Sequence, residues 1–226
     1  MSYASGAIRS PRRTRSRRGE GEQLRVEILE AAERILIETN DQSALSIRAI
    51  ANAVGVTPPS IYLHFADRND LVFAVCERHA QKLEEAMSGA ATGILDPWER
   101  IRRRGRAYLQ WGLDNPEHYR ILMMSRPDQT PDRFVDGRLA DTAGLAPVAD
   151  DVAEAIAIQR VASREEPLEM AKMLWMMIHG TVSLLISKPE FPFGPVDEIY
   201  ERLFELAHRG LAPRSDSDSL PASELP

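Results

Sequence analysis

The sequence has little of what several classes of protein require. Cysteine occurs once, as Cys76, which excludes a disulfide framework and a cysteine-based metal cage. No apolar run approaches the roughly 20 residues that span a bilayer, and no apolar signal core follows the arginine-rich start. A glycine-rich phosphate loop is absent, and the five histidines lie far apart, without metal-ligand spacing. We therefore expect a cytoplasmic protein with no enzymatic activity, no cofactor and no metal.

Positive charge is concentrated at one end of the chain. The 226 residues have a formal net charge of −6, yet residues 1–66 carry nine arginines against seven acids. The first part is therefore formally +2, and the remainder is −8. A basic end on an acidic body is expected where one end of a protein meets a polyanion and the rest has another task.

The two ends of the chain have compositions that do not support a packed core. Residues 1–19 are mostly Ser, Gly, Pro and Arg, and residues 213–226 are mostly Ser, Asp and Pro. Such segments bury too little apolar surface to offset the entropy of ordering, so we expect both to be disordered. The arginines between Arg9 and Arg18 leave two interpretations open. They form either an arm that follows DNA phosphates or the minor groove, or a solubilising tail.

Between these ends the sequence predicts an all-α fold. Apolar residues recur at helical spacing, and strand alternation is nowhere sustained. Residues 20–66 are expected to form a three-helix domain and residues 67–212 a helical body. The predicted helices are one with an apolar stripe from Leu24 to Leu36 that ends near Asn40, one from the N-cap Ser46 to Gly55, one from Thr57 to about Phe65, and then Asp67–Met87, Asp96–Asp114, Asn115–Met124, Val148–Ser163, Glu166–Ser187 and Val196–Leu211, with a long connection over Ser125–Pro147.

The second and third helices have the spacing of a helix-turn-helix. Val54, Gly55 and Val56 join them, and glycine permits the positive φ that such a turn needs. In this motif the second helix is aimed at a major groove. Ile47, Ile50, Ile61 and Phe65 are assigned to the core and given no part in binding.

A longer string makes the assignment more specific. Leu45 to Ala51, Val54 to Val56, Ser60 to Phe65 and Asp67 to Leu71 together resemble the DNA-binding domain of the TetR/AcrR family of repressors. The resemblance covers about residues 24–75. It implies a transcriptional regulator, cytoplasmic and associated with the nucleoid, that binds a double-stranded DNA operator as a homodimer.

The resemblance also implies which residues meet DNA. Thr57, Tyr62 and His64 would approach phosphates, where hydroxyl donors fix register without reading sequence. Tyr62 has a packing role as its alternative, and His64 a role as a helix cap. The other candidates are Arg48 and Arg68, which would flank the same backbone or be ordinary solvated charges, and the base-reading positions Pro58, Pro59 and Ser60. Prolines offer apolar contact but no donors, so hydrogen-bonded base reading is expected to be sparse.

The body carries a second, shorter resemblance. Asp114 to Arg120, and the string Trp175-Met176-Met177-Ile178-His179-Gly180, resemble the C-terminal domain of a TetR subgroup with a Trp-x-x-x-His-Gly pattern. The helix over Glu166–Ser187 is apolar on nearly every side and is expected to pack on its own body and on a partner subunit, with Tyr200, Leu203, Phe204 and Leu206 of the last helix completing the interface. The predicted site for a small apolar or amphipathic inducer comprises Tyr108, Trp111, Met123, Trp175, Met176 and His179. His179 is otherwise a satisfied core histidine.

Three hypotheses follow for function. The first is a homodimeric regulator, usually a repressor in families of this kind, that a small apolar ligand releases from a palindromic operator. The second is a DNA-binding and dimerisation protein without a ligand. The third, a helical enzyme or carrier that contains a helix-turn-helix, finds no titratable pair in the sequence to support it. The inducer, the operator sequence, the target genes and the sign of regulation are not encoded in one chain.

Overall fold

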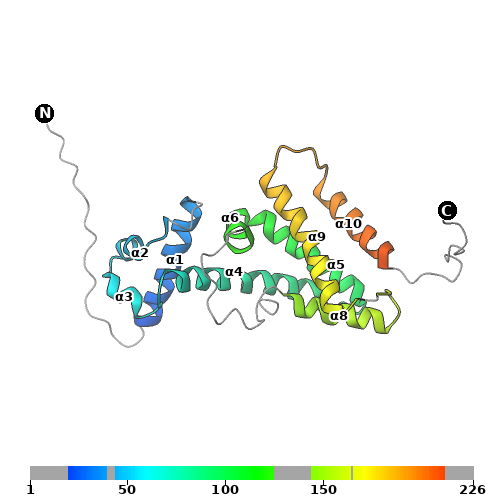
Figure 1. Ribbon diagram of the computed structural model, residues 1–226, viewed down its shortest axis with the longest axis horizontal. Helices are drawn as coiled ribbons and strands as arrows, with labels where there is room; N and C mark the ends of the chain where they lie inside the picture. Colours follow the sequence, from blue (N-terminus) through cyan, green and yellow to red (C-terminus); the bar gives the residue numbers. More distant parts are fainter. Residues whose placement is uncertain (1–19, 40–43, 125–143, 164, 212–226) are drawn as a thin grey trace, which may run out of the picture. The chain divides into compact units, whose positions relative to one another are not determined.

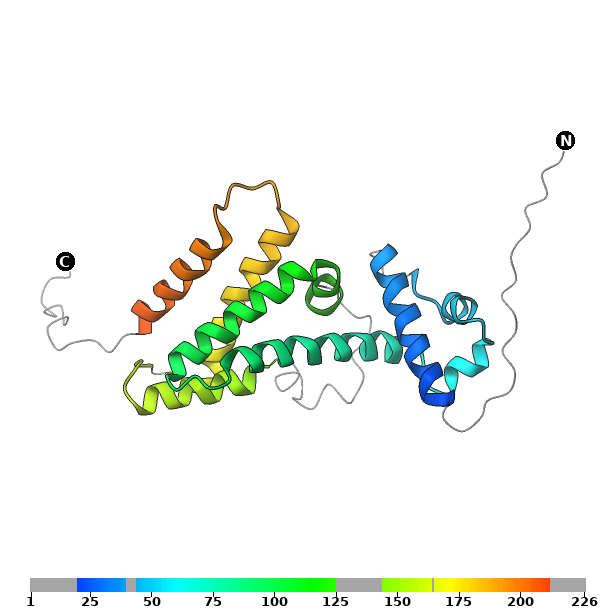
Figure 2. The same cartoon turned by 180° about the vertical axis from the view of Figure 1, so that it is seen from behind.

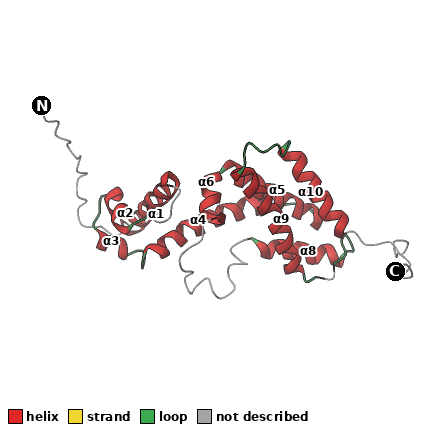
Figure 3. Cartoon of the chain, turned by 45° about the horizontal axis from the view of Figure 1, so that its top comes forward, coloured by secondary structure: helices red, strands yellow, loops and turns green. Residues whose placement is uncertain are grey.

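A computed structural model describes residues 20–39, 44–124, 144–163 and 165–211. Every regular element among these residues is helical, as the sequence predicts (Figure 3). The elements, labelled in Figure 1, are α1 (Glu20–Thr39), α2 (Ile47–Val54), α3 (Pro58–Tyr62), α4 (Arg68–Ala91), α5 (Pro97–Asp114), α6 (Pro116–Tyr119), the π-helical segment η2 (Arg120–Met124), α8 (Leu145–Ala157), α9 (Pro167–Ser187) and α10 (Val196–Leu211). The predicted arm, the tail and most of the predicted connection lie outside the described residues.

Several helix boundaries differ from the predicted ones. The third helix ends at Tyr62, not at Phe65, and α4 continues four residues past Met87. The helix predicted over Asn115–Met124 is one α-turn followed by π-helix, and the helix predicted from Val148 to Ser163 runs from Leu145 to Ala157. Gly144 explains the earlier start of α8, because its φ of +66° turns the chain into the helix.

The described chain divides into two compact units. One contains residues up to His79 together with the segment that starts at Glu117, and the other contains Ala80–Pro116 and α8 to α10. The division falls within α4, not ahead of it at residue 67, and it assigns most of α6 and η2 to the first unit. Each unit is therefore described separately.

The first unit has a core built from α1 to α4 and η2. Its buried apolar side chains include the predicted Ile50, Ile61 and Phe65, whereas Ile47 is only partly buried. Ile28, Ala31, Ala32 and Leu36 of the predicted α1 stripe are also buried. The helical period of the sequence thus identifies the side of α1 that packs.

Local capping residues fix the ends of the short helices in this unit. Ser46 Oγ accepts a hydrogen bond from the Ala49 amide at 3.1 Å, and Gly55 ends α2 with φ of +77°. At α4, Asp67 accepts from the Asp70 amide while Asp70 accepts from the Ala66 amide. This reciprocal pair confirms the start predicted there.

In the second unit, α5, α8 and α9 pack on one another, and α10 packs on α5. Tyr200 and Phe204 of α10 are buried against α5, where the Tyr200 hydroxyl donates to the Arg102 carbonyl and the Phe204 ring lies 4.8 Å from that of Trp98. Figure 2 shows the loop that joins α9 to α10 at one end. At the other end of α10, the Ala162 amide donates to the Leu211 carbonyl at 2.6 Å.

Arginines of α5 form ion pairs with acidic residues of α8 and α10. Arg100 and Arg104 both reach the buried Asp151 of α8, with N to O distances of 2.6 and 2.9 Å. Arg102 pairs with Glu99 on its own helix and with Glu201 of α10. Paired carboxylates and guanidiniums of this kind satisfy charges that would be costly to bury alone. These arginines serve the structure of the body.

One sequence expectation about apolar length is wrong. Among the described helices, α9 is 21 residues long and is apolar enough, by length and composition, to cross a membrane. Its sequence includes Glu169, Lys172 and His179, and it packs against α5 and α8. A core helix of a helical body passes the same test of length and composition.

Candidate functional site

The helix-turn-helix is formed by α2, a turn at Gly55 and α3. The Val56 amide donates to the Ala51 carbonyl at 2.9 Å, which closes the turn after Gly55 adopts its left-handed conformation. Ile50 and Ile61, one from each helix, are fully buried in the core of the unit. The turn and the two anchors fix α3 on α2 and leave its other side exposed.

Exposed groups surround α3. Thr57, Pro58 and Pro59 are exposed at its start, and the Tyr62 side chain is 55% exposed at its end. This exposure argues against the packing alternative for Tyr62, since a core tyrosine would be covered. Thr57 occupies the N-cap position, but its hydroxyl lies 3.2 Å from the Ser60 hydroxyl and makes no side-chain cap.

The missing cap at Thr57 has a simple cause. Prolines occupy the first two positions of α3, so neither offers an amide hydrogen. The Ser60 amide, the next along the helix, donates to the Thr57 carbonyl at 2.9 Å. Thr57 is therefore the N-cap residue of α3 without a side-chain hydrogen bond to a helix amide, and its hydroxyl lies beside that of Ser60.

The remaining DNA-binding candidates flank α3 in the first unit. Arg48 is exposed on α2, and Arg68 is partly buried at the start of α4. His64 is partly buried, near the start of α1, where a β-carbon on Gly21 would lie 3.9 Å from its ring. Leu63, 82% exposed beside Tyr62, was not predicted as part of this surface. In the sequence, the one indication of such a role for Leu63 is its position within Ser60 to Phe65, a segment that resembles the TetR/AcrR family.

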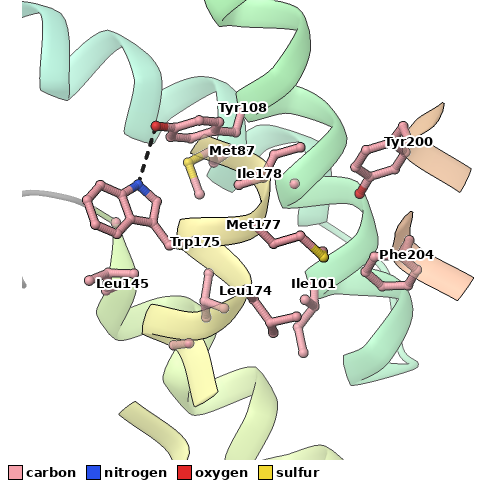
Figure 4. A pocket seen from close by; sticks show the side chains of 14 residues that line it. Met87, Ile101, Tyr108, Leu145, Leu174, Trp175, Met177, Ile178, Tyr200 and Phe204 are labelled. Carbon is pink, nitrogen blue, oxygen red and sulfur yellow. Dashed lines mark hydrogen bonds between the residues drawn. The ribbon is translucent and has the colours of Figure 1, made fainter. Parts of the chain in front are cut away.

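The second unit encloses an apolar cavity of about 50 Å³ (Figure 4). Side chains of α4, α5, α8, α9 and α10 line it, among them Met87, Leu145, Leu174, Met177, Ile178 and Phe204. Two of the predicted ligand residues, Tyr108 and Trp175, also line it. In this conformation, a cavity of this size holds only a few groups of the size of a water molecule.

Four of the predicted ligand residues do not line this cavity. Met176 is 58% exposed on the outer side of α9, one helical position away from the inward-facing Trp175 and Met177. Met123 belongs to the first unit, and Trp111 lies on α5 outside the lining. His179 is also outside the lining, with its Nδ1 atom 3.2 Å from the Tyr108 hydroxyl. For Met176 the cause is geometric, because adjacent residues of a helix point about 100° apart.

The polar atoms at this cavity form a short chain of hydrogen bonds. The Trp175 indole donates to the Tyr108 hydroxyl at 3.3 Å, and that hydroxyl lies 3.2 Å from His179 Nδ1. The His179 ring stacks on Trp175 with centroids 5.2 Å apart. Burial lowers the pKa of His179 below its ordinary value, so the ring is neutral at neutral pH.

A row of exposed apolar side chains runs along α9. Met173, Met176 and Leu184 are about half exposed, and their spacing places them on one face of the helix. Gly180 lies between them, and, apart from its own helix backbone and chain neighbours, no atom of the described residues lies within 4 Å of the position that its β-carbon would take. Leu206 on α10 is 68% exposed. We call Met173, Met176, Gly180 and Leu184 of α9, together with Leu206 of α10, the exposed row. Tyr200 and Phe204, predicted to face a partner subunit, are instead buried in their own body.

Cys76, the one cysteine, has no features of a nucleophile. It is half-buried on α4, and its thiol lies 3.8 Å from the Ile121 carbonyl. Burial raises its pKa to about 11, which keeps the thiol protonated at neutral pH. The sequence interpretation as a packing residue agrees with this environment.

A three-helix unit with an exposed recognition helix, joined in one chain to a helical body, defines a DNA-binding transcriptional regulator. Residues 28–75 match the bacterial regulatory proteins of the tetR family, and residues 101–207 match the tetracyclin repressor-like C-terminal domain. Together these matches span more than half of the sequence. The chain belongs to the TetR family.

Solved structures share this fold over most of the chain. A protein of unknown function from Rhodococcus sp. RHA1 is 24% identical, with a TM-score of 0.69 over 84% of this chain and 96% of its own. A TetR family transcription regulator from Marinobacter aquaeolei VT8 is 22% identical, with a TM-score of 0.66 over 88% and 100%. The fatty acid degradation regulator FadR from Bacillus halodurans is 14% identical, with a TM-score of 0.66 over 82% and 98%.

Proposed function

We propose that the protein is a homodimeric, cytoplasmic repressor that binds a palindromic operator and leaves it when a small apolar or amphipathic molecule enters the body. The observation that carries the ligand part is the Tyr108 hydroxyl at the wall of an otherwise apolar cavity. Ligand sites are commonly apolar with one or a few polar groups that fix orientation. The alternative is a DNA-binding and dimerisation protein that responds to no ligand.

The proposed DNA surface consists of Arg48, Thr57, Pro58, Pro59, Ser60, Tyr62, His64 and Arg68. The exposed hydroxyls of Thr57 and Tyr62 and the exposed Arg48 side chain suit phosphate contacts, which set register. The two proline rings suit apolar contact with a thymine methyl group. We therefore propose that phosphate contacts supply most of the affinity and that few bases are read by hydrogen bonds.

The exposed row supports a homodimer through α9 and α10. One short recognition helix reads only a few base pairs, so specificity requires two half-sites that a two-fold axis places together. The row offers apolar side chains around a glycine, which allows a partner helix to approach closely. Burying half-exposed leucines and methionines on both subunits supplies free energy at roughly 25 cal/mol per Å².

The proposed ligand site centres on Tyr108 and Trp175, with His179 behind them. The Trp-x-x-x-His-Gly pattern then has a structural reason. Trp175 and His179 lie on successive turns of α9, their rings stack, and both lie within hydrogen-bond distance of the Tyr108 hydroxyl. A ligand larger than the cavity enters only if the surrounding helices move apart. It shifts the population toward conformations whose recognition helices no longer match the operator. Because α4 belongs to both units, we propose that it transmits this motion.

A pair of matched variants tests the ligand site. Ala171 is buried and lines the cavity, whereas Ala153 is exposed on α8, so the same Ala→Val change adds two carbons inside the cavity or in solvent. Fatty acids and alcohols of increasing chain length serve as probes, and thermal stabilisation reports binding. We expect Ala171→Val to raise at least tenfold the probe concentration that is needed for a given increase in Tm. Ala153→Val should leave this concentration unchanged. No stabilisation of the wild-type protein by any probe would favour the ligand-free alternative.

A further inference from the structure

Three metal-ligating side chains meet in the first unit, although they are far apart in sequence. Glu33 of α1, His79 of α4 and His118 of α6 each bring one ligand atom to a common point, and these atoms lie within 4.8 Å of one another. His118 Nε2 is 2.9 Å from Glu33 Oε1, and His79 Nε2 is 3.4 Å from the same oxygen. None of the three takes part in the proposed DNA surface or ligand site.

The environment of this cluster is largely shielded from solvent. His79 is 1% exposed, and the side chains of Glu33 and His118 are mostly covered. The two imidazole rings lie 4.4 Å apart, with an angle of 46° between their planes. The neutral imidazole is the form of histidine that binds a metal ion.

The donor set and its spacing match one class of cation. Two imidazole nitrogens and one carboxylate oxygen suit Zn²⁺ and its neighbours among the divalent transition metals, whereas Ca²⁺ and Mg²⁺ prefer oxygen ligands. Ligands about 2.1 Å from a Zn²⁺ ion lie roughly 3.0 to 3.4 Å from one another. The two separations from Glu33 Oε1, 2.9 and 3.4 Å, fall close to this range, and the ligand atoms of the two histidines lie within 4.8 Å of each other.

We propose that Glu33, His79 and His118 form a binding site for a divalent transition-metal ion of the Zn²⁺ class. Three protein ligands leave a further coordination position for water or a small molecule. Because the ligands come from α1, α4 and α6, a bound ion ties these three helices together within the unit that carries α3. Arg78, whose guanidinium is 3.8 Å from the second oxygen of Glu33, orients that carboxylate from the outer side.

Titration of the metal-free full-length protein with Zn²⁺, in competition with a chromophoric chelator, tests the site. We expect one equivalent per chain to bind, with affinity that falls on acidification because protons compete for the imidazoles. His118→Gln and Glu33→Gln should each weaken binding by more than about a hundredfold, since even the loss of an outer-shell partner costs 10 to 100-fold. Circular dichroism confirms that each variant is folded.

A histidine elsewhere in the chain provides the control. His208 stacks on Trp98 in the other unit, and His208→Gln should leave Zn²⁺ affinity unchanged. Absence of saturable binding to the wild-type protein would overturn the proposal and leave a hydrogen-bonded Glu–His pair. Binding that survives both His118→Gln and Glu33→Gln would also overturn it, because the ion would then be held elsewhere. None of these outcomes depends on DNA or on an inducer.

Discussion

Gly105 offers the sharpest test of how the body is packed. It lies in α5, and a β-carbon added there would be 2.8 Å from the Tyr200 hydroxyl oxygen, too close for any real contact. The next nearest atoms are two ring carbons of Tyr200, at 3.6 and 3.7 Å, which is ordinary van der Waals distance. The conflict is thus with one oxygen, which cannot easily move because it donates to the Arg102 carbonyl.

The energies can be estimated from this geometry. Replacing a helical glycine by alanine stabilises a helix by about 0.5 to 1 kcal/mol. Forcing the Tyr200 ring aside costs about 1 to 3 kcal/mol for overpacking, and losing its hydrogen bond costs about 1 kcal/mol more. Gly105→Ala should therefore destabilise the protein by about 1 to 3 kcal/mol, which lowers Tm by roughly 2 to 10 °C in a chain of this size.

Removal of the oxygen should reverse the sign. Tyr200→Phe alone costs about 0.5 to 1.5 kcal/mol for the lost hydrogen bond. In that background Gly105→Ala meets only ring carbons, so it should stabilise by about 0.5 to 1 kcal/mol. Gly89→Ala in α4, where no atom lies within 4 Å of the new carbon, measures the helical preference alone. A Gly105→Ala effect of the same sign and size in both backgrounds would refute the reasoning.

Three further predictions concern DNA binding, dimerisation and the pH dependence of stability. Tyr62→Phe and Arg48→Ala should each weaken all operators by a similar factor, and Arg48→Ala should lower the slope of log affinity against log salt by about one; a base-dependent loss in footprinting titrations would contradict a phosphate role. Leu184→Glu should leave the helical circular dichroism spectrum unchanged, since the side chain is half exposed in the single chain, and weaken dimerisation at least tenfold in sedimentation equilibrium; an unchanged dimer would exclude the exposed row as its interface. Because the pKa of His179 is lowered in the folded state, the unfolded chain takes up its proton first as pH falls, so stability drops as the pH falls below the ordinary pKa of histidine, about 6.5. His179→Gln should reduce that drop in pH-dependent melting curves, and an equally steep profile would assign it to other groups.

Local rules were sufficient for the helix-turn-helix. Ser46 and Gly55 have side-chain and backbone preferences that act within one helical turn, so the sequence alone predicts where α2 begins and ends. The apolar period likewise predicts that Ile50 and Ile61 are buried. Thr57 shows the limit of the same rules: it is the N-cap residue of α3 but makes no side-chain cap, since Pro59 has no amide hydrogen and the Ser60 amide donates to the Thr57 carbonyl instead.

The same local rules do not predict which way a side chain points or which residues from distant parts of the chain meet. Met176 belongs to an apolar helix with few polar positions, so the sequence pattern does not separate its cavity side from its outer side. Glu33, His79 and His118 are 46 and 39 residues apart along the chain, and only the packing of three helices brings them together. The same holds for the contacts of Arg100 and Arg104 with Asp151, for which sequence offered only separate charges.

The two prolines of α3 also influence the thermodynamics of DNA recognition. A helix of five residues is far too short to be stable by itself, because nucleation fixes several dihedral angles for a single hydrogen bond. Pro58 and Pro59 have their φ angles fixed near −65° by their rings even in the unfolded chain. Part of the conformational entropy of the recognition helix is thus lost before the protein folds. Association with an operator then requires little further ordering of this element, so more of its contact energy is retained as affinity.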